Sequence, residues 1–180
     1  MIWLLTNALA LGAFWYLPRW WVKQDVAAIQ ADGSKDSLHE DFHRNRAILR
    51  ASTLLLVSGL GAAPWIHAGW GPWALNGVGL FSLGAAWFFF DFNPRLSKAR
   101  GLPTYYVSSD SRAAWMPDRY IWQKTVKACP PPKAVEPSID WVLCRKQCAA
   151  NLLKRLLRQV LAAGLLVYLA AAVAANVVGV

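Results

Sequence analysis

Charged residues are scarce in this sequence of 180 residues. Only 16% of the residues are Asp, Glu, Lys or Arg, whereas 56% are hydrophobic. Soluble domains carry about 25% charged and roughly 45–50% apolar residues, so this shortage of charge argues against a soluble enzyme. Eleven residues are Trp, a side chain that favours the boundary between lipid and water because it has an apolar and a polar end. The composition is therefore typical of a membrane protein.

Four stretches of the sequence contain almost no charge. A helix needs about 20 apolar residues to cross the hydrocarbon of a bilayer, where all its backbone groups must be hydrogen-bonded. The predicted spans are residues 2–17, 47–66, 73–90 and 160–178, and Arg50 is the one charged residue within them. We therefore expect one integral membrane domain over residues 1–180. Its predicted fold is an all-α four-helix transmembrane bundle with cytoplasmic interfacial helices.

The charged residues are unevenly placed along the chain. All 19 Lys and Arg and all 10 Asp and Glu lie between residues 18 and 50 or between residues 91 and 158. Lys and Arg accumulate on the cytoplasmic side of membrane proteins. Residues 18–46 and 91–158 are therefore predicted to be cytoplasmic. This orientation places both termini outside a multi-pass protein of the inner (cytoplasmic) membrane.

The first cytoplasmic segment contains two helix signals. Pro18 is predicted to kink or restart the first helix, because proline removes a backbone donor. Apolar residues recur at helical spacing over residues 19–30, which predicts a short helix lying on the inner leaflet. Ser37 and Glu40 form the S-x-x-E pattern of a capping box, which predicts a helix that runs into the second span.

The second cytoplasmic segment contains a helix stop and two helix starts. Asn93 and Pro94 are predicted to end the third span. A helix is expected over about residues 117–128, since Pro117 suits its first turn and three prolines follow it. Ser138 is expected to cap a helix that continues from Ile139 into the fourth span. That helix would have ~40 residues and a length of about 60 Å, twice the thickness of the hydrocarbon.

The segment that follows the third span has a recognisable sequence. Residues 90–95 read Phe-Asp-Phe-Asn-Pro-Arg, and residues 100–107 read Arg-Gly-Leu-Pro-Thr-Tyr-Tyr-Val. The segment from Phe90 to Val107 resembles a juxtamembrane segment of uncharacterised small four-span membrane proteins of bacterial and phage genomes. The resemblance is confined to this short segment and implies no particular activity.

One motif suggests metal chemistry. Residues 39–43 match H-E-x-x-H, in which two histidines on one helical face chelate zinc and the glutamate acts as general base. The motif resembles that of the intramembrane zinc proteases, and this resemblance implies His39, His43 and Asp91 as metal ligands and Glu40 as the catalytic residue. Here the motif lies in a charged flank, however, and Asp91 lacks the glycine context of that family. We prefer a capping role for Glu40, and predict no cofactor and no enzymatic activity.

The three cysteines, Cys129, Cys144 and Cys148, all fall on the predicted cytoplasmic side. A disulfide is not expected in that compartment. Cys144 and Cys148 are spaced to share a helical face, and metal binding or acylation are alternatives. We prefer to interpret them as small residues that pack between helices.

The second cytoplasmic segment is strongly basic. Residues 93–158 contain thirteen Lys and Arg but four acidic residues. Anionic headgroups attract such a segment by about 1 kcal/mol per basic residue near the surface. We prefer lipid to nucleic acid as the ligand, because leucines alternate with the last basic residues as in an interfacial amphipathic helix. The predicted lipid-binding residues are Arg95, Lys98, Arg100, Arg145, Lys146, Lys154, Arg155 and Arg158.

Together these patterns favour a non-catalytic membrane scaffold or accessory protein, anchored at the inner leaflet by its basic loop. Gly and Ala recur in the predicted spans, and such residues let helices pack closely within one chain or in a homo-oligomer. A phage-type holin or another pore-forming protein is an alternative, because such proteins are small and their spans are rich in Gly and Ala. The zinc metalloprotease is a second alternative.

Overall fold

The computed structural model describes residues 2–31, 40–107, 116–128 and 139–179. Within these ranges the protein is all-helical and contains no β-strand. The elements in chain order are α1 (Ile2–Ala31), α2 (Glu40–Ala62), the 3-10 helix η1 (Ala63–Ala68), α3 (Trp70–Ala99), α4 (Met116–Ala128) and α5 (Ile139–Val178). The helices predicted over residues 117–128 and from Ile139 into the fourth span are confirmed.

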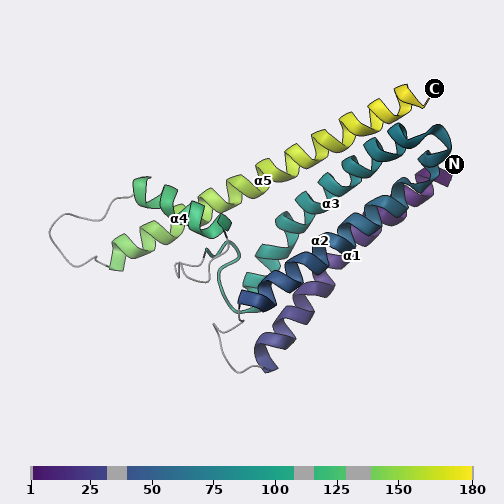
Figure 1. Cartoon of the computed structure of the whole chain (residues 1–180). Coiled ribbons are helices and arrows are strands. Elements are labelled where there is room, and N and C mark those ends of the chain that lie inside the picture. Colours follow the sequence, from purple (N-terminus) through teal and green to yellow (C-terminus); the bar gives the residue numbers. More distant parts are fainter. Residues whose placement is uncertain (1, 32–39, 108–115, 129–138, 180) are drawn as a thin grey trace.

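The long helices α1, α2, α3 and α5 run side by side (Figure 1). Both chain ends and η1 lie at one end of this arrangement, whereas α4 lies at the other end, beside the first half of α5 (Figure 1). Helix α3 packs against α1, α2 and α5. Among the described helices, α5 packs against α3 and α4 only. The molecule is therefore a cluster of three helices to which α5 is attached along one side.

Three helical segments are long and apolar enough to cross a membrane: Asn45–Ala68, Trp70–Ala99 and Val142–Val178. They contain the second, third and fourth predicted spans. Helix α1 is not one of them, although it has 30 residues. Length and composition thus support a membrane protein with at least three of the four predicted spans.

Helix α1 departs from the sequence prediction in the part that follows Pro18. It continues through Pro18 without interruption as far as Ala31, so the predicted restart at Pro18 is wrong. Trp21 and Val22 lie in the same apolar core as Leu54 of α2 and Phe92 of α3. The apolar face of residues 19–30 therefore packs against neighbouring helices, which bury it more completely than the surface of a leaflet would.

Helix α3 also passes through its proline. It includes Pro94 and continues to Ala99, so the predicted stop at Asn93 and Pro94 is wrong. Transmembrane helices tolerate proline where neighbours satisfy the freed backbone groups. The helix ends at Gly101, whose φ of 72° is a left-handed conformation that glycine adopts readily.

Glycines mark the closest approaches between helices. A Cβ at Gly164 of α5 would lie 2.9 Å from the backbone oxygen of Ser82, and one at Gly79 of α3 would lie 2.9 Å from the Cβ of Ala171. A Cβ at Gly84 would meet the ring of Phe14 at 2.8 Å. These small residues lie where helices of the same chain approach each other closely.

A second apolar core lies at the end of the molecule that carries α4. Its buried residues are Val107, Ile121, Ala149, Leu153 and Leu157. Phe89 and Phe90 of α3 and Tyr105 pack against it. The core joins α4 and the first half of α5 into one unit, hereafter the α4–α5 unit, which is attached to the end of α3.

Candidate functional site

A buried ion pair joins α1 to α2. The Oδ1 atom of Asp25 accepts a hydrogen bond from Arg50 Nη2 at 2.6 Å and a second one from Arg46 Nη1. Only 9% of the Asp25 side chain and 12% of the Arg50 side chain are exposed. Buried charges are costly unless they are paired. Asp25 therefore fixes the position of α1 against the beginning of the second span.

Aromatic rings from two helices surround Arg50. Its guanidinium carbon lies 4.5 Å from the ring centre of Phe92, 5.7 Å from that of Trp21 and 5.9 Å from that of Phe88. Rings at such distances attract a cation through their quadrupoles. Phe88 and Phe92 also stack on each other with ring centres 4.7 Å apart. Arg50 thus connects α1, α2 and α3, and we call Asp25, Arg46, Arg50 and these three rings the Arg50 cluster.

A second aromatic row lies between α1 and α3. The Arg19 guanidinium is 3.9 Å from the ring centre of Trp15, and Trp15 stacks on Trp87 with ring centres 5.1 Å apart. Trp87 in turn contacts Phe90 at 5.7 Å. Both aromatic groups therefore contact the same two turns of α3, residues 87–92. Arg19 and Arg50 consequently lie at one level of the bundle.

Asp91 lies at that level as well. Its Oδ1 atom accepts a hydrogen bond from Arg95 Nε at 2.7 Å, and 11% of its side chain is exposed. Its Oδ2 atom is buried and has no hydrogen-bond partner among the described residues. The carboxylate that the sequence offers as a metal ligand is thus bound by the arginine one turn further along α3.

The other predicted metal ligands cannot be placed against Asp91. His39 and the side chains of Glu40 and His43 lie outside the described residues, although Glu40 and His43 belong to the first turn of α2. Within the described part of the chain, no three His, Cys, Asp or Glu side chains come together as a metal site requires. The zinc-protease alternative stays a prediction from the sequence.

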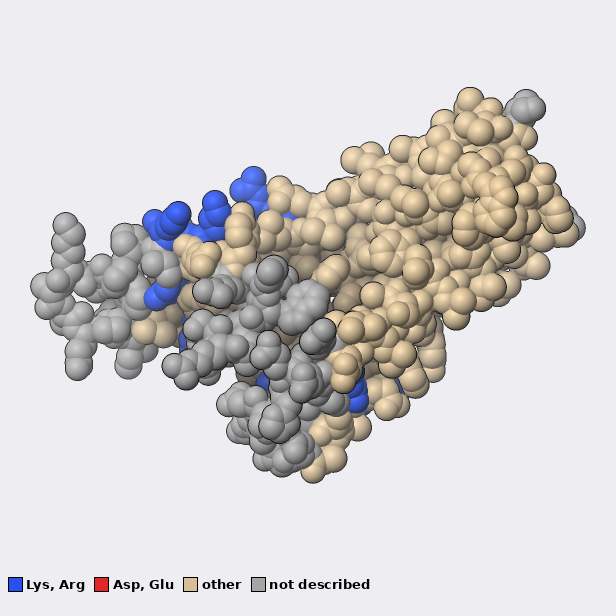
Figure 2. Space-filling model, viewed as in Figure 1, with Lys and Arg blue, Asp and Glu red and all other residues tan. Residues whose placement is uncertain are grey.

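The predicted lipid-binding residues divide into two groups. Six of them have side chains that project from the molecule: Arg95, Lys98 and Arg100 of the α3 end, and Lys146, Arg155 and Arg158 of α5. Figure 2 shows the visible Lys and Arg side chains at the end of the molecule that carries the α4–α5 unit, whereas the opposite end shows none. These six side chains are thus exposed, and Arg95 among them also donates a hydrogen bond to Asp91.

Arg145 and Lys154 form the second group, because they pack against aromatic rings. The Arg145 guanidinium lies 5.1 Å from the ring centre of Trp122 in α4, and Lys154 Nζ lies 5.6 Å from the ring centre of Tyr105. Both residues therefore hold the α4–α5 unit together. Sequence reasoning did not distinguish them from their exposed neighbours.

The leucines next to these basic residues do not face lipid. Leu153 and Leu157 are buried in the core of the α4–α5 unit, and Leu152 and Leu156 pack against it. The sequence analysis assigned these leucines to an interfacial amphipathic helix. An apolar stripe on a helix can be buried in a protein core or in a lipid leaflet, and the sequence pattern of the leucines is the same for both.

Two cysteines lie on the same segment of α5. Cys144 is exposed and Cys148 is half-buried, and neither forms a disulfide. Cys129 lies outside the described residues. The predicted packing role therefore suits Cys148 better than Cys144.

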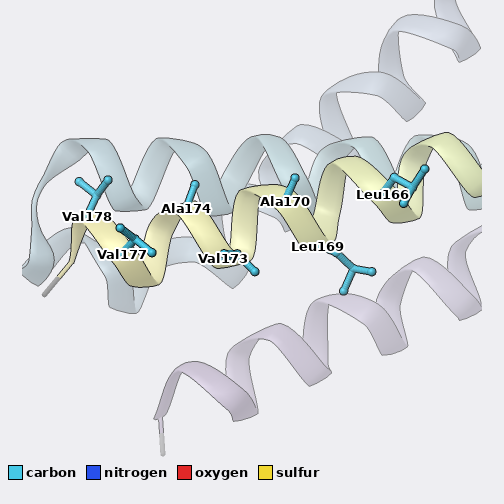
Figure 3. Close-up of a pocket in the computed structure, with 7 residues that line it drawn as sticks. All are labelled: Leu166, Leu169, Ala170, Val173, Ala174, Val177 and Val178. Carbon is cyan, nitrogen blue, oxygen red and sulfur yellow. The ribbon is translucent and has the colours of Figure 1, made fainter.

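The membrane half of α5 carries an open apolar groove (Figure 3). Every residue that lines it belongs to α5: Leu166, Leu169, Ala170, Val173, Ala174, Val177 and Val178. These side chains offer no polar group, so the groove has no catalytic chemistry. Its composition suits contact with lipid chains.

No family model matches the chain, and no curated protein or solved structure is found to be similar to it.

Proposed function

We propose that this protein is a four-span scaffold or accessory protein of the inner membrane, non-catalytic, with both termini outside. The proposal rests on one observation. The charged residues nearest to the four apolar stretches lie at the same height along the axis of the helix bundle. Arg50 of α2 contacts Phe88 and Phe92 of α3, near Asp91. Arg19 of α1 lies over Trp15, which stacks on Trp87 of α3. Arg158 of α5 follows Leu157, which shares a core with Phe90 of α3. One plane through these residues can therefore serve as the inner boundary of the hydrocarbon for all four helices. We call this plane the inner border.

The opposite ends of the helices fit a second plane. A Cβ at Gly179 would lie 3.4 Å from the Cβ of Ala68 and 3.4 Å from the ring of Trp65, so the residue that follows α5 lies beside η1. Helix α1 also packs against η1. The apolar stretch of α5, residues 160–178, is about 28 Å long at 1.5 Å per residue, which matches a hydrocarbon thickness of about 30 Å.

The packing of α1 supports its assignment as a fourth span. Asn7 of α1 and Asn76 of α3 are both buried, and the amide of Asn76 donates a hydrogen bond to Asn7 at 3.5 Å. Leu5 and Leu9 on the other side of α1 are exposed. Apolar residues outside and polar residues inside are the arrangement that lipid favours.

The roles of the buried polar groups support a scaffold. Asp25, Arg46 and Arg50 connect α1 with α2, and Asn7 with Asn76 connects α1 with α3. These groups stabilise helix positions. The exposed Lys98, Arg100, Arg155 and Arg158 lie within about 14 Å of the inner border along their helices, so anionic headgroups of the inner leaflet attract them.

Thiol labelling tests the orientation. Ala68→Cys in a chain whose three cysteines are changed to Ser should react with a membrane-impermeant maleimide in intact cells. Native Cys144, in a Cys129→Ser/Cys148→Ser chain, should react only in inverted vesicles. Labelling of both sites from the same side would contradict the proposal, as would complete release of the chain from membranes by alkaline extraction.

A further inference from the structure

Helix α5 continues far beyond the apolar stretch. It is a single helix of 40 residues, which at 1.5 Å per residue is about 60 Å long. Residues 160–178 account for about half of this length and suffice to cross the hydrocarbon. Residues 139–158 therefore extend about 30 Å past the inner border, if the four-span arrangement proposed above holds.

This half of α5 does not lie on the leaflet. The helix is antiparallel to α3, with Gly164 against Ser82 and Gly79 against Ala171, and it keeps this course as far as α4 (Figure 1). An interfacial helix needs an apolar face for the lipid. The apolar face of this segment is already covered by α4, as the burial of Leu153 shows. The segment thus projects into the cytoplasm.

The basic residues in this half of α5 form two sets that differ in their distance from the inner border. Arg155 and Arg158 lie at the inner border. Lys146 lies twelve residues, or about 18 Å, further along the helix. The headgroup layer extends only about 6 Å past the hydrocarbon, and charges are screened over about 8 Å at physiological ionic strength. Lys146 is therefore beyond the attraction of the headgroups, and lipid does not explain the positive charge of this part of the unit.

The charged side chains of the α4–α5 unit that the structure describes are Lys124, Lys127, Arg145, Lys146, Lys154, Arg155 and Arg158. Asp118, Arg119 and Asp140 belong to the same helices, with side chains outside the described part, so the unit is predominantly basic. Figure 2 shows basic side chains along its edge and no acidic one on the visible face of the described residues. The exposed face of α5 also presents Leu143, Gln147 and Asn151. An anionic partner is the electrostatic complement of such a surface.

The composition of this face favours a protein partner over a nucleic acid. Single-stranded nucleic acids bind aromatic platforms, and duplexes use many phosphate contacts. The exposed side chains of α5 between residues 143 and 158 include no aromatic ring and three basic groups, Lys146, Arg155 and Arg158. Leu143 is 57% exposed, and an apolar side chain gains by contact with protein but has no partner on a phosphate backbone.

We propose that the exposed face of α5 formed by Leu143, Lys146, Gln147, Asn151, Arg155 and Arg158 is a docking surface for an acidic segment of a cytoplasmic protein. The surface runs along the axis of a projecting helix, so a helical or extended acidic segment aligns with it. Carboxylates of the partner pair with the basic residues at the two ends, while Gln147 and Asn151 offer hydrogen bonds between them. The proposed partner of the scaffold is thus a cytoplasmic protein that carries an acidic segment.

The first test measures how far the surface stands from the lipid. A bimane label on Cys144, in the Cys129→Ser/Cys148→Ser chain, is compared in nanodiscs with a label at Arg158→Cys in a chain without native cysteines. Lipids with a nitroxide on the headgroup should quench the label at residue 158 strongly and the label at Cys144 weakly. Equal quenching at both positions would overturn the projecting arrangement, even if labelling from the two sides confirms the four spans.

The second test measures binding. The probe is a fluorescein-labelled peptide of repeated Glu-Glu-Leu-Gln units, titrated against the full chain in nanodiscs of neutral lipid. Lys146→Glu/Arg155→Glu should weaken binding by at least about tenfold, because two attractive contacts become repulsive. Lys124→Glu/Lys127→Glu makes the same change of charge on α4 and should alter the affinity by less than about threefold.

Three results would overturn the docking surface. The first is an equal loss of affinity in both double variants, which would show attraction to net charge alone. The second is the absence of peptide binding to the wild-type chain. The third is tighter binding of a single-stranded oligonucleotide than of the peptide, with the same dependence on Lys146 and Arg155. A topology measurement on each variant separates these results from failure of the four-span arrangement.

Discussion

The two sides of α3 are packed by different chemistry. Towards α1 and α2, α3 contributes Phe88 and Phe92 to the Arg50 cluster and Asn76 to a buried hydrogen bond. Towards the membrane half of α5, close contacts at Gly79 and Gly164 hold the helices together. On the first side, polar contacts act together with the close approach of Gly84 to Phe14, whereas close packing of small residues holds the other side. An added side chain at Gly164 should therefore loosen α5, while the position of α1 should depend on its charges as well as on its packing.

Removal of the charge of Asp25 should have the largest effect. Asp25→Asn leaves Arg46 and Arg50 without the carboxylate that they share. The loss of one partner from a buried ion pair lowers the free energy of unfolding by about 3 kcal/mol or more. A value of about 3 kcal/mol is expected here, because Arg46 is partly exposed. Thermal unfolding in detergent, followed by Trp fluorescence, measures the change.

The triple variant Asp25→Leu/Arg46→Met/Arg50→Met is the control. Replacement of all the charges removes the uncompensated arginines, so most of the lost stability should return. If Asp25→Asn is as stable as the wild-type chain, the ion pair does not hold α1 against α2.

Gly164→Val should separate α5 from α3. Its side chain would collide with the backbone of Ser82 as well as with Ala86, and overpacking of this kind costs about 2 kcal/mol. Gly59→Val makes the same change on α2, where nothing lies within 4 Å of the added Cβ. A cysteine cross-link between α3 and α5 should form poorly in the first variant and normally in the second. Equal cross-linking in both would contradict the close approach.

Arg50→Lys should have a smaller effect. The variant keeps the charge next to Asp25 but loses the planar guanidinium that faces Phe92 at 4.5 Å. A loss of about 1 kcal/mol is expected, because lysine does not reproduce stacking on an aromatic face. A double-mutant cycle with Phe92→Leu measures this coupling, and independent effects of the two substitutions would exclude it.

Asn76→Leu should have the smallest effect. The substitution removes the hydrogen bond to Asn7 and replaces the amide by an apolar group with the same number of heavy atoms. Polar contacts between helices in lipid average about 0.6 kcal/mol. Chemical unfolding in mixed micelles should show a loss of this size. A gain in stability would mean that Asn76 weakens the contact between α1 and α3.

The apolar periodicity and the capping signals were sufficient to predict α4 and the whole of α5. They failed at Pro94 and in the restart considered at Pro18, since the effect of a proline depends on neighbouring helices that a local pattern does not contain. The leucines of α5 were assigned to lipid for the same reason. A helical stripe shows that one face is buried, whereas only the tertiary fold identifies what covers it.

The Arg50 cluster was missed, although its signal was present. Asp25 is three residues from Val22 and four from Trp21, so it shares the apolar face of α1. An acidic residue on such a face requires a basic partner, and Arg46 and Arg50 are spaced for one face of the next helix. The distance of Phe92 from these residues in the sequence explains why its ring was not foreseen.

The location of the amino-terminal end tests the account most directly, because α1 is proposed as a span on the basis of its packing and not of its hydropathy. Ile2→Cys is introduced into a chain without native cysteines and treated with an impermeant maleimide in intact cells. Labelling from outside, together with protection in inverted vesicles, is the predicted result. Labelling only in inverted vesicles would place this end in the cytoplasm and contradict the four-span arrangement.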